Sequence, residues 1–566
     1  MSERLLKVHF TPGDGKGWAL DEDLRQIRAS LAGMIRESGA AGAEVIHAPF
    51  WQNLSMVSPE ILKRAFVIAH ADNPPFFYLK QPEFLAGQQQ VDLWVARSRE
   101  ALSQFQELGL PAIHIPYTID PGLFFPINDK AALRREFGIP EDAYVIANFH
   151  RDTEGADLRM PKVQKNPEFM MAILRRLKDQ GIPFHVLLAG PRRHWIREAL
   201  GNDGMSFTFV GKEAAGDDFG TNILDRTTLN RLYNAADLYL IPSRWEGGPQ
   251  SAMEAAACRC KILSVPIGVG RDILESKSLF RSSTEAAQRL ADDIREGELN
   301  PTVQPQFERW EASHTTAMLR HGLQELYRRI PDMDGFHAKR TKPRALLTVS
   351  ALGQLFFTIR RRISRAQLPG EVALNHREGV DAALDRIMKR VETMLQDLGV
   401  TISREVGAAV EIAGWPRWKN RGATRFQWVV PGMPKEELLG DASLIAVSVQ
   451  EVVNLRSDGC RQPAVTIPVV EISDKEAEEP LVVASGNRDA SLQIWEALAE
   501  GRPVIYPENS AYYDQVFHAG IAYGEGEDPA PLAEQARGMV DELRELRYLP
   551  SLRATQGVLR AVLLHL

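Results

Sequence analysis

Short apolar runs alternate with amphipathic stretches through the first 330 residues. The runs KVHFT at 7–11, AEVIHAP at 43–49, AFVIAHA at 65–71 and DLWVARS at 92–98 predict buried strands. A helix is expected from about Asp21 to Glu37, and AIHIPYTID at 112–120 predicts one more strand. Strands that alternate with helices form a parallel sheet that is covered on both faces. The first part of the chain is therefore predicted to be an α/β lobe.

The same alternation starts again at about Asp129. A helix is followed by the strand AYVIANFHRD, a polar loop at 153–165 and the helix NPEFMMAILRRLKDQG. The runs FHVLLAG and Phe207–Lys212 predict further strands, and a helix at about 306–329 is expected to close this second lobe. Because 566 residues are too many for one hydrophobic core, the pattern indicates several domains.

The stretch from Leu229 to Glu275 combines this pattern with candidate chemistry. It reads as a helix, the buried strand YLIPS, the turn RWEGG, the helix QSAMEAAACRC and the strand KILSVPIG. The free N–H groups at the start of that second helix can receive an anion. Glu246 in the turn and Glu254 in the helix are placed so that both carboxylates can face one cleft, although a pair of solvated helix acids is the simpler alternative.

The whole block AADLYLIPSRWEGGP-x4-EA-x-A resembles the donor-binding segment of retaining glycosyltransferases with the GT-B fold, as in family 4 (glycosyltransferase group 1). The resemblance implies that the helix at 306–329 packs back on the first lobe and that Glu246 and Glu254 form the E-x7-E pair of that family. Glu246 would bind the donor sugar near its anomeric carbon, and Glu254 would accept hydrogen bonds from the ribose. Gly247, Gly248 and Pro249 would belong to the same donor site.

The resemblance also implies that an Arg and a Lys hold the donor diphosphate, since a guanidinium fork and a mobile ammonium both suit phosphate oxygens. The matching residues are Arg151 and Lys165, with Arg159 and Lys162 in the same long loop. Which two of these four cations reach the phosphates stays open, and a solvated basic loop is the alternative.

Three further positions are implied in the first lobe. Gly15 and Gly17 follow the first strand, where the family often contacts the donor phosphates, but a plain surface loop is equally compatible with them. His70 stands at a strand end, where ligands gather in such sheets and where the family places a histidine against the donor sugar. A purely structural histidine is the alternative, and His47 is a weaker candidate.

The remaining residues predict a third, incomplete unit. GAEV near Gly42 is echoed by GAAVEI after Gly407, and AIHIP by AVTIP. The central block recurs as SGNRDASLQIWEALAEGRP, with Glu496 at the position of Glu254 but Arg488 at that of Glu246. The predicted fold class is therefore α/β, GT-B, with two Rossmann-like lobes followed by a partial, degenerate GT-B-like module that supports, dimerises or binds acceptor. The expected boundaries are 1–127 (acceptor lobe), 128–331 (donor lobe), 332–402 (helical connector) and 403–566 (accessory module).

The connector carries an apolar stripe with arginines at its end, in residues 345–365. A basic amphipathic helix can lie in a membrane interface. A connector that packs its stripe against a neighbouring domain is the favoured alternative.

Composition narrows the partners. The formal net charge of −7 argues against a general nucleic-acid binder, and 44% apolar with 25% charged residues is ordinary for a soluble protein. Three cysteines form no disulfide framework, and Cys258 and Cys260 have no neighbouring cluster that predicts a metal site. With no signal peptide and no run of 18 apolar residues, a cytoplasmic protein is expected, possibly peripheral at the inner face of the membrane.

The resemblance to these glycosyltransferases implies a metal-independent hexosyltransferase that needs no cofactor. It would move a sugar from a nucleotide diphosphate sugar, such as a UDP- or GDP-sugar, to a hydroxyl of a glycan, lipid-linked or protein acceptor, with retention and in polysaccharide biosynthesis. Cationic side chains and a helix N-terminus would stabilise the departing diphosphate. The alternative is a catalytically weak sugar-nucleotide-binding or scaffold protein, and a homo-oligomer is possible.

Overall fold

The computed structural model describes residues 5–340, except 14–18, 80, 82 and 154–156, and separate pieces of the chain between 371 and 537. Two of the predicted donor-site residues, Gly15 and Gly17, lie outside the described residues. The same is true of the amphipathic stripe at 345–365 and of Arg488.

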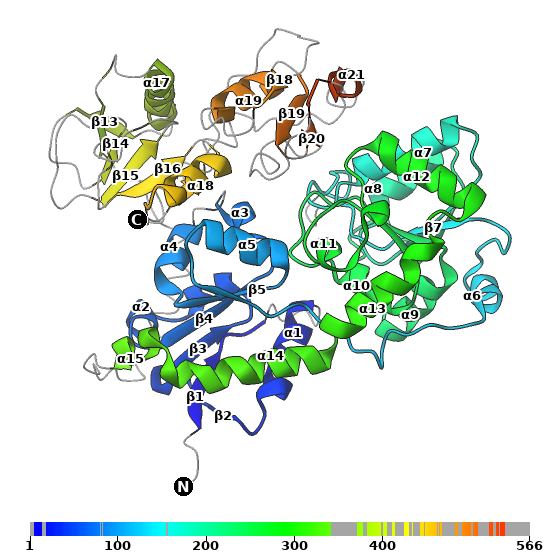
Figure 1. Ribbon diagram of the computed structural model, residues 1–566, viewed down its shortest axis with the longest axis horizontal. Coiled ribbons are helices and arrows are strands. Elements are labelled where there is room, and N and C mark those ends of the chain that lie inside the picture. The colour runs from blue at the N-terminus through cyan, green and yellow to red at the C-terminus, as the bar shows by residue number, and fades with distance from the viewer. Residues whose placement is uncertain are drawn as a thin grey trace.

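The first lobe has one six-stranded parallel sheet in the order β2-β1-β3-β4-β5-β6 (Figure 1). Helices α1 and α14 pack against each other on one face, and helices α4 and α5 cover the other. The strands are β1 (Leu6–Phe10), β2 (Ile35–Glu37), β3 (Val45–Ala48), β4 (Phe66–Ala71), β5 (Leu93–Ala96) and β6 (Ala112–His114). The helices are α1 (Ala19–Leu31), α2 (Pro59–Leu62), α3 (Pro75–Tyr78), α4 (Glu83–Gln90), α5 (Arg99–Glu107), α14 (Thr316–Arg329) and α15 (Asp334–Arg340).

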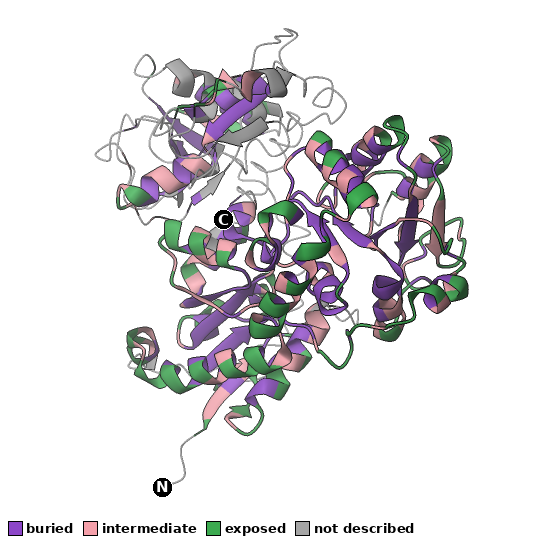
Figure 2. Cartoon of the chain, turned by 45° about the vertical axis from the view of Figure 1, so that its right-hand side comes forward, coloured by how far each residue is buried: buried purple, intermediate pink, exposed green. Residues whose placement is uncertain are grey.

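The second lobe is a five-stranded parallel sheet in the order β11-β10-β7-β8-β9. Its central strands are fully buried, with the exposed sides of the surrounding helices facing outward (Figure 2). The strands are β7 (Val145–Asn148), β8 (His185–Ala189), β9 (Phe207–Val210), β10 (Leu238–Ile241) and β11 (Lys261–Ser264). The helices are α6 (Lys130–Phe137), α7 (Pro167–Asp179), α8 (His194–Asn202), α9 (Arg226–Ala235), α10 (Gln250–Ala257), α11 (Val269–Ile273), α12 (Ser283–Glu296) and α13 (Val303–Ser313).

Two expected helices end differently in the structure. The helix expected at 21–37 stops at Leu31, because Gly33 adopts a left-handed conformation (φ +80°), and residues 35–37 form the edge strand β2. The single helix expected at 306–329 is two helices, α13 and α14, separated at His314 and Thr315. As predicted, α14 returns to the first lobe, where its Leu319, Leu323 and Tyr327 join the core.

The C-terminal module repeats the first lobe. Its six-stranded parallel sheet has the order β13-β12-β14-β15-β16-β17, which matches the first sheet strand for strand. The strands are β12 (Glu371–Asn375), β13 (Thr401–Ser403), β14 (Val410–Ala413), β15 (Thr424–Val429), β16 (Ser443–Ala446) and β17 (Ala464–Thr466), with helices α17 (Ala382–Asp397) and α18 (Val449–Ser457).

A smaller sheet, β18-β19-β20, follows in the sequence, at the point where a complete copy would continue with a second lobe. It comprises β18 (Leu481–Val482), β19 (Val504–Pro507) and β20 (Gly520–Tyr523), with helices α19 (Ala490–Ala499) and α21 (Leu532–Arg537). Two Rossmann-like lobes followed by a full first-lobe copy and a fragment of a second confirm the predicted fold class. The module lies against α4 and α5 of the first lobe (Figure 1), where Gln88 Nε2 donates to the Ala464 carbonyl oxygen at 2.8 Å.

Candidate functional site

The turn between β10 and α10 is the point where the two lobes meet. A Cβ atom built on Gly247 would overlap the Asp72 carbonyl oxygen and stand 2.5 Å from the Asp72 carbonyl carbon. One built on Gly248 would overlap the ring of Tyr117. Asp72 and Tyr117 belong to the first lobe and the linker, so both glycines are required by close approach across the lobes.

Glu246, the residue before these glycines, forms an ion pair with Lys165. The side chains are only 9% and 18% exposed, so the pair is largely removed from water. The backbone fixes this meeting, since Arg244 N donates to the Gln164 carbonyl oxygen at 2.9 Å. The structure thus places two of the predicted site residues in direct contact.

Glu254 lies in α10 with both carboxylate oxygens occupied. Its Oε1 accepts from Arg226 Nη1 at 2.6 Å and its Oε2 from the Tyr233 hydroxyl at 2.8 Å. Burial raises the pKa of Glu254, and Arg226 and the Tyr233 hydrogen bond oppose that rise. Neither partner was foreseen from the sequence. Arg226 and Tyr233 thus hold the Glu254 carboxylate within the second lobe.

The other three candidate cations, Arg151, Arg159 and Lys162, belong to the same long loop. The Arg151 guanidinium lies over the ring of Phe219, 5.6 Å from its centroid. Arg159 is exposed in a turn closed by Asp157, and Lys162 is half-buried, with its backbone N–H bound to the Asp152 carbonyl oxygen. Among these candidates, Lys165 forms an ion pair with a carboxylate of the E-x7-E pair.

His150, which the sequence did not single out, holds the start of α10. Its Nε2 is 2.9 Å from Ser251 Oγ and its Nδ1 is 3.4 Å from Ser243 Oγ. Burial, followed by the charge of Lys165, holds the pKa of His150 well below its usual range. A neutral imidazole therefore links the two ends of the turn between β10 and α10. Nothing in the sequence around His150 indicated that this residue would contact the two serines.

His70 is buried at the end of β4, where its two ring nitrogens have partners inside the first lobe. Nε2 lies 2.7 Å from His47 Nε2, and Nδ1 lies 3.3 Å from Arg97 Nη1. Burial and the Arg97 charge hold the pKa of His70 well below its usual range. In this state His70 binds other residues of its own lobe, and the contact to donor sugar stays a prediction.

Asp72 is a carboxylate at the lobe junction that the site prediction left out. It accepts a hydrogen bond from the Tyr78 hydroxyl, and its backbone carbonyl meets Gly247. Burial raises the pKa of Asp72 to about 6, and the charge of Glu246 adds to the rise. The junction therefore brings together two carboxyl groups from different lobes.

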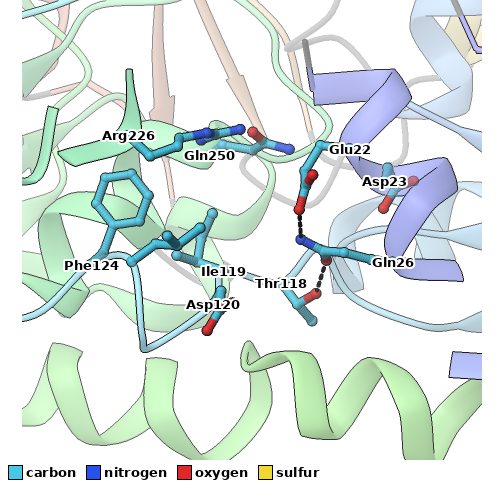
Figure 3. A pocket seen from close by; sticks show the side chains of 10 residues that line it. Glu22, Asp23, Gln26, Thr118, Ile119, Asp120, Phe124, Arg226 and Gln250 are labelled. Carbon is cyan, nitrogen blue, oxygen red and sulfur yellow. Dashed lines mark hydrogen bonds between the residues drawn. The ribbon is translucent and has the colours of Figure 1, made fainter. Parts of the chain in front are cut away.

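A small pocket opens on the linker side of the same junction (Figure 3). Glu22, Asp23 and Gln26 of α1 form one wall, and Arg226 and Gln250 of the second lobe form the opposite wall. Gln26 Nε2 donates to Glu22 at 2.8 Å, and its Oε1 accepts from Thr118 Oγ1 at 3.2 Å. Because Arg226 also binds Glu254, the pocket adjoins the predicted ribose end of the donor site.

Within the described ranges, no group of three or more His, Cys, Asp or Glu side chains is arranged to hold a metal ion. No described helix combines the length and apolarity needed to cross a membrane. Cys258, Cys260 and Cys460 carry free thiols.

Residues 158–296 match the family model of glycosyl transferases group 1. The match spans most of the second lobe, including Lys165, Glu246 and Glu254, and about a quarter of the chain. The resemblance to group 1 glycosyltransferases is thereby confirmed for that segment. No curated protein matches the chain.

Solved structures of low identity are also similar to this chain. HepE of Anabaena, in complex with UDP and glucose, is 15% identical; the match covers 57% of this chain and 99% of HepE, with a TM-score of 0.46. Sucrose-phosphate synthase from Thermosynechococcus elongatus is 17% identical over 54% of this chain and 76% of that protein, with a TM-score of 0.42. The pneumococcal O-GlcNAc transferase GtfA, bound to UDP and GlcNAc, is 13% identical over 50% and 56%, with a TM-score of 0.35.

Proposed function

We propose that the chain is a glycosyltransferase that moves a sugar from a nucleotide diphosphate sugar to a hydroxyl acceptor with retention of configuration. The observation that carries the proposal is the buried contact of Lys165 with Glu246, inside the segment that matches the group 1 family. A lysine ammonium beside the turn of an anion-accepting helix is suited to a diphosphate leaving group.

The ion pairs Lys165–Glu246 and Arg226–Glu254 suggest how the donor would bind. The diphosphate would take Lys165 from Glu246, which frees Glu246 to accept hydrogen bonds from the sugar hydroxyls. The ribose would take Glu254 Oε1 from Arg226. Each exchange replaces one charge-assisted hydrogen bond with another, so neither carboxylate is left buried and unpaired. The acceptor proton would pass to the departing phosphate on the same face of the sugar.

A panel of UDP-, GDP-, ADP- and dTDP-sugars, scored by thermal shift and by nucleotide release, tests the proposal. We expect one donor to stabilise the chain and to be transferred or slowly hydrolysed. Glu246→Gln should abolish turnover while retaining most of the thermal shift, since the amide keeps the size of the side chain. Glu213→Gln is the matched control, because Glu213 is 83% exposed and binds only Arg197 on the surface. Donor binding without turnover would instead identify a sugar-nucleotide-binding scaffold, and no binding to any donor would reject both.

A further inference from the structure

A continuous polar chain runs through the core of the first lobe, beneath the lobe junction. Arg97 Nη2 donates to Asp23 Oδ1 at 2.5 Å, and Arg97 Nη1 lies 3.3 Å from His70 Nδ1. His70 contacts His47 as described above, and His47 Nδ1 lies 2.8 Å from the Tyr327 hydroxyl of α14. All five side chains are at most 5% exposed.

The arginine sets the protonation pattern of this chain. A guanidinium can only donate, so His70 Nδ1 accepts, and the single proton of the neutral imidazole is on Nε2. His70 therefore donates to His47 Nε2, and His47 donates from Nδ1 to Tyr327. Burial lowers the pKa of His47 to about 3, which is consistent with a neutral ring there as well.

The C-terminal copy shows what the same sheet looks like without this chain. Ser98 and Ser448 cap equivalent helices, and the strand registers then relate the remaining positions. Through the β4–β5 and β15–β16 ladders, His70 corresponds to Trp428; through the next ladder, His47 corresponds to Ile412.

Asp23 and Arg97 also have apolar counterparts. Asp23 corresponds to Ile387, because Leu24, Ile27 and Leu31 of α1 align without a gap with Met388, Val391 and Leu395 of α17. Val447 stands in the sequence where Arg97 stands, one residue before the capping serine. Ile387, Ile412 and Trp428 are buried. The sheet therefore does not need the polar chain in order to fold.

Burying an ion pair and two imidazoles seldom adds stability over apolar residues of similar volume. Because the ion pair and the two imidazoles occur in the first lobe and have apolar counterparts in the C-terminal copy, we infer that they serve a function other than stability. Their position indicates what that function is. The Arg97 guanidinium lies 4.2 Å from the ring centroid of Tyr117, which packs against Gly248. Asp72, which meets Gly247, follows His70 by two residues. The polar chain thus adjoins Asp72 and Tyr117, the two first-lobe surfaces that meet the turn carrying Glu246.

We propose that Arg97 and Asp23 are positioning residues for sugar transfer, which act by holding His70 neutral and by fixing the Asp72 and Tyr117 surfaces against the Glu246 turn. The inference rests on the proposed function. It assigns no contact with substrate to either residue.

The test compares three variants of the full chain: Arg97→Met, Arg97→Lys and the double variant Asp23→Leu/Arg97→Met. The double variant replaces the buried ion pair with apolar side chains, as the copy does at these two positions, so its melting temperature should equal or exceed that of the wild type. Its thermal shift with the donor nucleotide should persist, whereas kcat should fall on the order of 100-fold, as expected for a misplaced reacting group. Arg97→Lys should recover part of kcat.

The pH profile separates positioning from a structural role. In Arg97→Met, His70 Nδ1 would lose the guanidinium and face the carboxylate of Asp23, whose Oδ2 is 4.0 Å away. The other titratable groups around His70 stay unchanged: His47 on β3, Tyr327 on α14, and Asp72 two residues further along the chain. His70 should then take up a proton near neutral pH, which adds an acid limb to the activity profile that the wild type lacks. Arg134→Met is the control, since this buried arginine binds carbonyl groups and Asp237 far from the junction.

Histidine resonances of protein with labelled imidazoles would follow the titration of His70 without any need for turnover. A double variant that folds and keeps the wild-type kcat and pH profile would overturn the inference, as would an Arg97→Met variant in which His70 does not titrate. If the wild type transfers no sugar from any donor, the proposed function fails, and the histidine titration still decides whether Arg97 controls His70.

Discussion

Gly247→Ala should prevent the lobes from closing while leaving both lobes folded. Gly247 lies outside the left-handed region of φ, so alanine is compatible with its backbone conformation. The added Cβ would overlap the Asp72 carbonyl oxygen, with the Asp72 carbonyl carbon at 2.5 Å and Asn73 Cα at 2.8 Å. All three are backbone atoms, which cannot move aside as a flexible side chain can.

The magnitude follows from the cost of forcing one extra methyl into a packed contact. Overpacking of this kind costs about 1–3 kcal/mol, and here the cost falls on the closed arrangement alone. If transfer takes place in the closed state, kcat/KM should fall by about 5- to 150-fold. The melting temperature should change little, because the cores of both lobes are untouched.

Nucleotide release at limiting donor would measure kcat/KM, and small-angle scattering would measure the radius of gyration without donor. We expect a larger radius for Gly247→Ala than for the wild type. Gly216→Ala is the matched control, since a Cβ there meets nothing within 4 Å and Gly216 is also outside the left-handed region. Wild-type kcat/KM together with an unchanged radius in Gly247→Ala would refute the closed junction as the active arrangement.

Three further predictions concern charge and packing. Lys165→Met should lower the free energy of unfolding by about 3–5 kcal/mol, because it leaves the Glu246 carboxylate buried and unpaired. Urea unfolding should show that the double variant Lys165→Met/Glu246→Gln regains most of this loss. A single variant as stable as the wild type would contradict the pairing. Asp72 has a folded pKa of about 6 against 3.8 ordinarily, so the native state binds more protons between these values and stability falls as pH rises through that window, by about 3 kcal/mol for this group. Melting curves from pH 4 to 7 should lose that part of the slope in Asp72→Asn, and an unchanged slope would show that Asp72 ionises normally. A chain shortened to residues 1–340 should self-associate in sedimentation experiments, because the truncation exposes the face of α4 and α5 against which the C-terminal module packs. A monodisperse monomer would show that the exposed face does not cause association.

The features that the sequence predicted well are those encoded within a short stretch. The strand, turn and helix around Glu246 occupy some twenty consecutive residues, so periodicity and glycine placement defined them together. The early end of α1 was also readable in principle, because Gly33 supplies the left-handed residue that stops a helix. The expected helix at 21–37 missed this, since the apolar spacing alone continued past it.

The contacts between distant residues at the site could not be predicted from the sequence, for a different reason. Arg97 and Asp23 are 74 residues apart, and Asp72 and Gly247 lie in different lobes. No local pattern determines which strand end faces which turn, so the polar chain and the closed junction depend on tertiary packing. Arg226 was missed in the same way, because it stands 28 residues before the Glu254 that it binds.

The internal duplication separates residues that both copies of the sheet keep from residues that the sheet does not need. Both copies keep the capping serine, Ser98 or Ser448, and the apolar face of the first helix, because either loss would destabilise the sheet. A buried polar chain is different, since replacing all of it with apolar side chains preserves or raises stability. Once a copy is released from catalysis, these positions are the first that can change without cost. The buried apolar residues Ile412 and Trp428 at the sites of His47 and His70 therefore agree with the proposal that sugar transfer takes place between the first two lobes and not in the C-terminal module.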